Sequence, residues 1–118
     1  MSWDPHLWDQ YDSLSRYSQI SIDCLSHYGA FVEKRSQIEY EYYSKLNSLS
    51  DSYICKLNHT TSREPEIQAL TWYKSLIKVF KSNKQLSNQH DTNSNLLRSL
   101  HDEIECFVQE INNEKGNT

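Results

Sequence analysis

Apolar and aromatic residues recur at alternating steps of three and four along the first half of the chain. This spacing places side chains on one face of a helix, whereas a half-buried strand would alternate every second residue. Ser18 and Ser36 stand where the stripe calls for apolar groups. The stripe consists of Leu7, Tyr11, Leu14, Ile22, Leu25, Gly29, Val32, Glu39, Tyr42, Leu46, Leu49 and Tyr53.

A second stripe runs from Ile67 to Phe80, fades over residues 81–95, and returns from Leu96 to Ile111. The polar middle is open to two interpretations, a kink or a stretch that a partner helix covers. Asp4 and Pro5 resemble an N-cap followed by proline at the first helical position, and Ser62 is a candidate cap for a second helix. The predicted boundaries are a helix over about 5–54, a loop over about 55–65, a helix over about 66–113 and a tail over 114–118.

Two long helices joined by one loop predict an all-α fold, a long antiparallel two-helix hairpin. A hairpin has a single internal interface, and ordering the backbone costs about 1–2 kcal/mol per residue. We therefore expect residues 1–118 to form one partial domain that needs further helices, which self-association would supply.

Composition narrows the function. The formal net charge is −4, so the chain as a whole is not predicted to bind nucleic acid, and any anion site must be a local patch. Three cysteines without a CxxC pair are typical of reduced thiols in a cytosolic protein. No signal peptide and no membrane span are predicted. HExxH, GxSxG and glycine-rich phosphate motifs are missing, so we predict no enzyme activity, no metal site and no cofactor.

Two motifs carry a family resemblance. The opening Leu7-Trp8-Asp9-Gln10-Tyr11 and the later Arg35-x-x-Ile38-Glu39-x-x-Tyr42/Tyr43-x-Lys45-Leu46 resemble F-BAR domains. Gln89-His90-Asp91 is similar to the Gln-His-Glu of the family's second helix. The formin-binding-protein and Toca subfamily is the most similar group. The resemblance is specific in the first half of the chain and weaker in the second.

The resemblance implies the N-terminal portion of an elongated helical-bundle dimer. Such a module binds anionic membrane (phosphoinositides and phosphatidylserine), senses or remodels curvature, and links membrane to actin dynamics and endocytosis. The implied location is cytoplasmic, peripheral at the plasma membrane, at endocytic sites and at the cortical cytoskeleton. The implied partners are anionic membrane and a second F-BAR chain, as homodimer or heterodimer. The alternative is a truncated helical interaction module that only dimerises with longer relatives and does not bind lipid.

Candidate site residues follow from charge and from the stripe. Glu33, Asp51 and Ser52 occupy places where the family often has cations, which weakens the lipid interpretation there. The competing interpretation of the lysines is that they form a solvated helix face without a ligand. For Arg35 the competing interpretation is an ion pair with Glu39, one helical turn away at i+4. The candidate lipid-binding residues are Lys34, Arg35, Lys56, Arg63, Lys74, Lys78, Lys81 and Lys84. The candidate core or dimer residues are Trp3, Leu7, Trp8, Tyr11, Leu14, Leu25, Val32 and Leu49.

Overall fold

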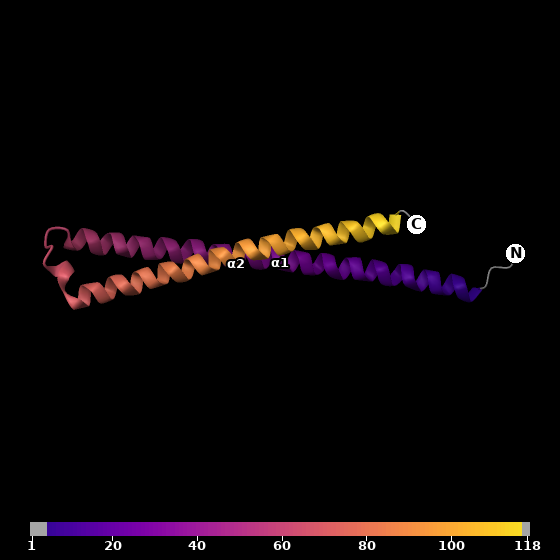
Figure 1. Cartoon of the computed structure of the whole chain (residues 1–118), viewed down its shortest axis with the longest axis horizontal. Coiled ribbons are helices and arrows are strands. Elements are labelled where there is room, and N and C mark those ends of the chain that lie inside the picture. Colours follow the sequence, from indigo (N-terminus) through magenta and orange to yellow (C-terminus); the bar gives the residue numbers. More distant parts are fainter. Residues whose placement is uncertain (1–4, 117–118) are drawn as a thin grey trace. The chain divides into compact units, whose positions relative to one another are not determined.

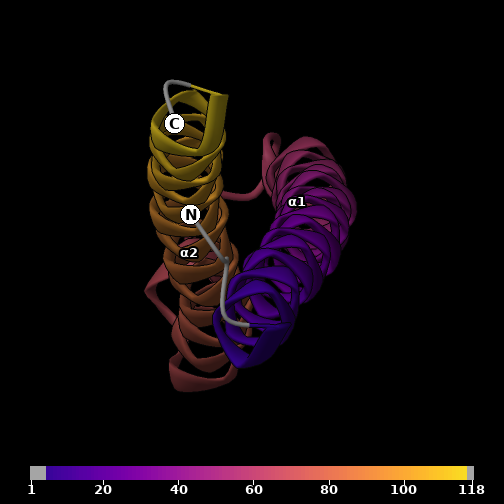
Figure 2. The same cartoon turned by 90° about the vertical axis from the view of Figure 1, so that its right-hand side faces the viewer.

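The computed structural model describes the backbone of residues 5–116 and the side chains of residues 15–114. Two long helices, α1 (Pro5–Thr61) and α2 (Thr71–Gly116), are joined by a turn that contains the short 3-10 helix η1 (Ile67–Ala69) (Figure 1). Each helix is a continuous ribbon in both views (Figure 2), and residues 5–116 contain no strand. The predicted all-α pair of long helices is confirmed.

The helix ends differ from the prediction. α1 continues past residue 54 to Thr61, and α2 begins at Thr71, after η1, and runs to Gly116, through most of the predicted tail. Polar tertiary contacts hold the last turns of α1, since the Tyr73 hydroxyl donates to Asn58 Oδ1 at 2.8 Å. Ser62 does not cap α2, because its hydroxyl donates to the His59 carbonyl at the end of α1 (2.9 Å).

The chain divides into two compact units. The central unit comprises residues 35–97, and the terminal unit comprises residues 1–34 and 98–118. The central unit thus contains the second half of α1, the turn and the first half of α2. The terminal unit contains the first half of α1 and the second half of α2.

In the central unit the helices meet mainly through small and polar side chains. Ser87 and Ser94 are fully buried, and Ser36 and Ser50 are nearly so. The Ser94 hydroxyl donates to the backbone carbonyl of Ser36 at 2.9 Å. The polar middle of α2 is therefore its contact with α1, and Ser36 belongs to the buried stripe despite its polarity. Small hydroxyl side chains let two helices approach closely while their own hydrogen bonds are satisfied.

In the terminal unit the described contact is more apolar. Ile22 and Val32 are buried, and the buried Gly29 faces Ile104 of α2. A Cβ at position 29 would lie 3.2 Å from Ile104 Cγ2, so the absence of a side chain there permits this close approach.

The predicted core residues have mixed outcomes. Val32 is 2% exposed and Leu25 is half-buried. Leu49 is 55% exposed, because its neighbour Ser50 occupies the buried position of α1. Leu49 is thus not a core residue within this chain, and its place in a dimer stays a prediction. Trp3, Leu7, Trp8, Tyr11 and Leu14 lie outside the residues whose side chains are described.

Candidate functional site

Charge is distributed unequally between the two units. Residues 35–97 carry eight Lys and Arg against six Asp and Glu, a formal charge of +2. Residues 1–34 and 98–118 carry four Lys and Arg against ten Asp and Glu, a formal charge of −6. An acidic chain therefore contains a unit of net positive charge.

One candidate cation, Arg35, is held by an ion pair inside the central unit. Its guanidinium lies 2.7 Å from Glu39 Oε1, as the i,i+4 interpretation predicted. Glu39 is buried, and its other oxygen contacts the ring of His90 from α2. The hydrogen bond with His90 lowers the pKa of the Glu39 carboxyl, Arg35 reinforces this effect, and burial opposes it. Arg35 therefore serves the helix contact first.

Two further candidates have partners within their own unit. The Lys84 ammonium donates to Asp51 Oδ1 at 2.6 Å, so this lysine turns toward α1. The Lys56 ammonium lies 4.7 Å from the centre of the Tyr53 ring, a cation–π arrangement that leaves its charge in water. Lys84 is thus the least available of the lysines predicted to share one face of α2.

Lys74, Lys78 and Lys81, here called the lysine face, are exposed on α2. Steps of four and three keep them within about 60° around the helix axis. The preceding residue Tyr73 contacts α1, so the lysine face points away from that contact. Among the described residues no ion pair engages these three ammonium groups. They form the least neutralised run of positive charge in the central unit.

The remaining candidates stand apart from the lysine face. Arg63 is exposed in the turn. Lys34 is exposed on α1 and belongs to the terminal unit. The structure therefore does not show the eight candidate cations as one surface, and it separates paired cations from unpaired ones.

An apolar groove lies between α1 and α2 in the central unit, with a volume of about 380 Å³. Leu49 and Tyr53 of α1 and Val79 of α2 line it while remaining about half exposed. Exposed apolar side chains that gather in one place are typical of a surface that another helix covers. The groove is lined by Leu46, Leu49, Ser50, Tyr53, Val79, Phe80 and Asn83.

Sequence reasoning missed the part that His90 plays in the helix contact. Its ring binds Glu39 and lies 4.0 Å, centre to centre, from the ring of Tyr42. Both signals were present, as Glu39 lies in the stripe of α1 and His90 in the motif Gln89-His90-Asp91. We did not predict from the sequence that a polar pair, Glu39 and His90, would join the two helices in place of an apolar pair.

Comparisons with known proteins complete the description. Residues 10–92 match the family described as "FCH: Fes/CIP4, and EFC/F-BAR homology domain". The chain is 42% identical over 65 residues to formin-binding protein 1-like of Rattus norvegicus, covering 55% of this chain and 11% of that protein. It is 37% identical over 68 residues to Cdc42-interacting protein 4 of Mus musculus, covering 58% of this chain and 11% of that protein. No solved structure matches the chain. Within the described residues, neither helix has a stretch apolar and long enough to span a bilayer.

Proposed function

This chain belongs to the F-BAR homology family, and from that premise we propose that it is a membrane-binding adaptor module that acts through its basic central unit. One observation carries the proposal: the lysine face is exposed and free of ion pairs within the described residues, in a unit of charge +2. Each lysine near an anionic membrane surface contributes about 1 kcal/mol. The Tyr73 contact holds α2 in place, so the three lysines of the lysine face can bind a membrane with little further loss of conformational entropy.

The proposal ranks the candidate cations. Lys74, Lys78 and Lys81 contribute most, and exposed Lys56 and Arg63 add to them in the same unit. Arg35 and Lys84 contribute least, because binding lipid would require breaking the ion pairs with Glu39 and Asp51. Phosphoinositide and phosphatidylserine headgroups are the proposed ligands, since their phosphate and carboxylate groups are the anions that lysine pairs with at a bilayer surface. A curvature-dependent link from membrane to actin dynamics and endocytosis is the proposed wider role.

Sedimentation with phosphatidylserine-rich vesicles and with neutral vesicles tests the proposal. Lys78→Glu combined with Lys81→Glu should weaken binding to anionic vesicles by about 30-fold or more, from the loss of about 2 kcal/mol. The matched control is Arg16→Glu with Arg98→Glu, which changes the net charge equally at exposed positions of the terminal unit. We expect the control to bind almost as the parent does.

Equal losses in both variants would show that net charge, and not the lysine face, governs binding. Equal binding of the parent to anionic and neutral vesicles would overturn the lipid function itself.

The apolar groove favours a second candidate function, a helical interaction module that pairs with another F-BAR chain. Exposed Leu49, Tyr53 and Val79 would be covered in such a pair. Light scattering of the vesicle-test preparations separates the two functions. A dimer that ignores vesicles supports the interaction module, whereas a dimer that prefers anionic vesicles supports the adaptor.

A further inference from the structure

His101 of α2 lies in the terminal unit with its ring mostly buried, its side chain being 15% exposed. Its Nδ1 lies 2.9 Å from the backbone carbonyl oxygen of Gly29 on α1. A carbonyl oxygen can only accept, so Nδ1 must carry the proton and donate it. In the neutral imidazole this leaves a lone pair on Nε2.

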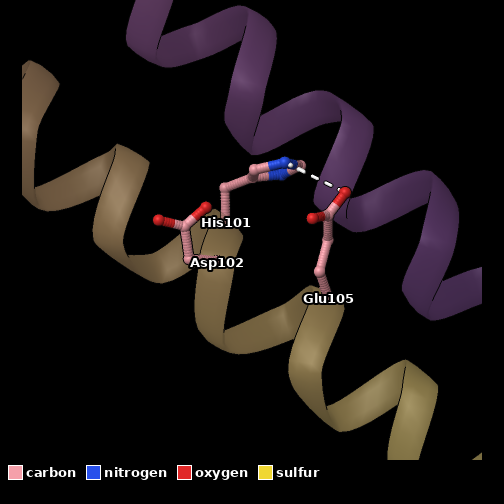
Figure 3. Close-up of side chains that lie close together, drawn as sticks. All are labelled: His101, Asp102 and Glu105. Carbon is pink, nitrogen blue, oxygen red and sulfur yellow. Dashed lines mark ion pairs between the residues drawn. The ribbon is translucent and has the colours of Figure 1, made fainter.

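Carboxylates surround that second nitrogen. Glu105 Oε1 lies 3.3 Å from Nε2, one turn further along α2, and Glu33 Oε2 of α1 lies 4.0 Å from it. Figure 3 shows the His101 ring and the Glu105 carboxylate pointing toward one another, with the carboxylate of Asp102 on the other side of His101. A lone pair that faces two carboxylates is unfavourable unless a proton or a metal cation lies between them.

The geometry points to a metal ion. We propose that His101 Nε2, Glu105 and Glu33, here called the histidine site, bind a divalent transition metal of the Zn²⁺ class. Ligands about 2.0–2.1 Å from a tetrahedral ion lie about 3.3 Å apart, which is the His101–Glu105 separation. Glu33 Oε2 lies 4.0 Å from the same nitrogen, Nε2 of His101, and its side chain is 54% exposed.

The surroundings support a cation at this place. A histidine that binds metal usually donates its other ring N–H to a carboxylate or a backbone carbonyl, which is the role of the Gly29 carbonyl here. The terminal unit has a formal charge of −6. Asp102 adds negative charge nearby, because ligand atoms of His101, Asp102 and Glu105 all lie within 4.8 Å of one another. Water would complete the coordination, because the pocket lined by Glu33, His101 and Glu105 is open and has a volume of about 250 Å³.

The sequence prediction of no metal site rested on local motifs. His101 and Glu105 are close in sequence, but Glu33 and the Gly29 carbonyl come from the other helix. Their convergence depends on the antiparallel pairing of the two helices within the terminal unit, which no short motif encodes.

Calorimetric titration of the 118-residue chain with Zn²⁺ tests the histidine site. Cys24, Cys55 and Cys106 are exposed and would bind zinc themselves, so each is first replaced by Ser. One Zn²⁺ per chain is expected, with affinity lowered about tenfold or more by His101→Gln and by Glu105→Gln. His27→Gln is the matched control, an exposed histidine of the same unit, and should leave binding unchanged. Asp102→Asn should weaken binding by less than about threefold.

Nitrogen NMR of the histidine rings gives an independent readout. Zn²⁺ should shift the Nε2 resonance of His101 and leave the resonance of Nδ1, which faces the Gly29 carbonyl, nearly unchanged. Glu105→Gln keeps the contact with Gly29, so this variant remains informative if His101→Gln does not fold. Absence of saturable binding, binding that both Gln variants retain, or an Nε2 resonance that Zn²⁺ does not shift would each overturn the proposal. The last result would identify the cluster as an ion pair only.

Discussion

The two units of this chain use the same pair of helices but form different contacts between them. In the terminal unit Ile22 and Val32 are buried and Gly29 approaches Ile104. In the central unit the buried residues are mostly serine, with the carboxylate of Glu39, and Tyr73 is the buried hydrophobic residue. The charges differ as well, −6 against +2. One helical pair thus contains an acidic unit whose helix contact is largely apolar and a basic unit whose helix contact is largely polar.

The difference shows why an apolar stripe alone describes this pair incompletely. Buried serines and a buried ion pair specify which residues face each other, since a shifted register would leave polar groups without partners. Aliphatic contacts tolerate small shifts more easily. The central unit therefore fixes the register more strictly than the terminal unit does.

The largest expected effect is at the close contact of the terminal unit. Gly29→Leu places four carbons against Ile104 and against the ring of His101, and should lower the free energy of unfolding by about 2–3 kcal/mol. Chemical denaturation followed by circular dichroism measures it. Ala30→Leu, at the exposed neighbouring position, is the control and should change stability by less than about 0.5 kcal/mol. Similar costs for both variants would show that the helices do not meet at Gly29.

A smaller effect, dependent on pH, is expected in the central unit. The folded pKa of Glu39 is depressed below its usual 4.5, so the carboxylate stabilises the fold above that value. This stability is lost as pH falls from about 4.5 through the folded pKa. Glu39→Gln should cost about 1–2 kcal/mol at neutral pH and flatten this acid dependence. Unfolding measured from pH 7 to pH 3, with exposed Glu41→Gln as control, gives both quantities. If the stability of Glu39→Gln falls with decreasing pH as steeply as that of the parent, the pH dependence arises from another group.

The smallest effect concerns the pair between Lys84 and Asp51. Both side chains are nearly half exposed, so solvent screens their attraction. A double-mutant cycle with Lys84→Met and Asp51→Asn should give a coupling energy below about 1 kcal/mol, and less in high salt. A coupling well above that value would mean that the central unit depends on surface charge as well as on its buried network.

The sequence predicted the two helices well and their ends poorly. Steps of three and four identified α1 and α2, and placed Val32 and Gly29 on the buried face. The end of α1 was set too early, because the residues that hold it, Asn58 and Thr61, are polar and bind Tyr73 and Gln68 across the turn. Such contacts leave no periodic signal.

The site was predicted less completely than the fold. Residue type and spacing identified the lysine face, but Lys84 leaves it because Asp51 of the other helix attracts its ammonium group. The histidine site could not be predicted at all, since Glu33 and His101 meet only when α1 and α2 pair. Interactions within one helix follow from spacing, whereas those between helices depend on a register that polar side chains set.

The buried serines of the central unit also have a thermal consequence. The heat capacity change of unfolding rises with newly exposed apolar surface, about +0.45 cal/K/mol per Å², and falls with polar surface, about −0.26. Opening a contact built around Ser36, Ser87 and Ser94 exposes little apolar area. We therefore expect the heat capacity change of this unit to lie below the usual ~12–15 cal/mol/K per residue. Its stability curve is correspondingly flat, so cooling or warming by several degrees alters the contact between these helix segments only slightly.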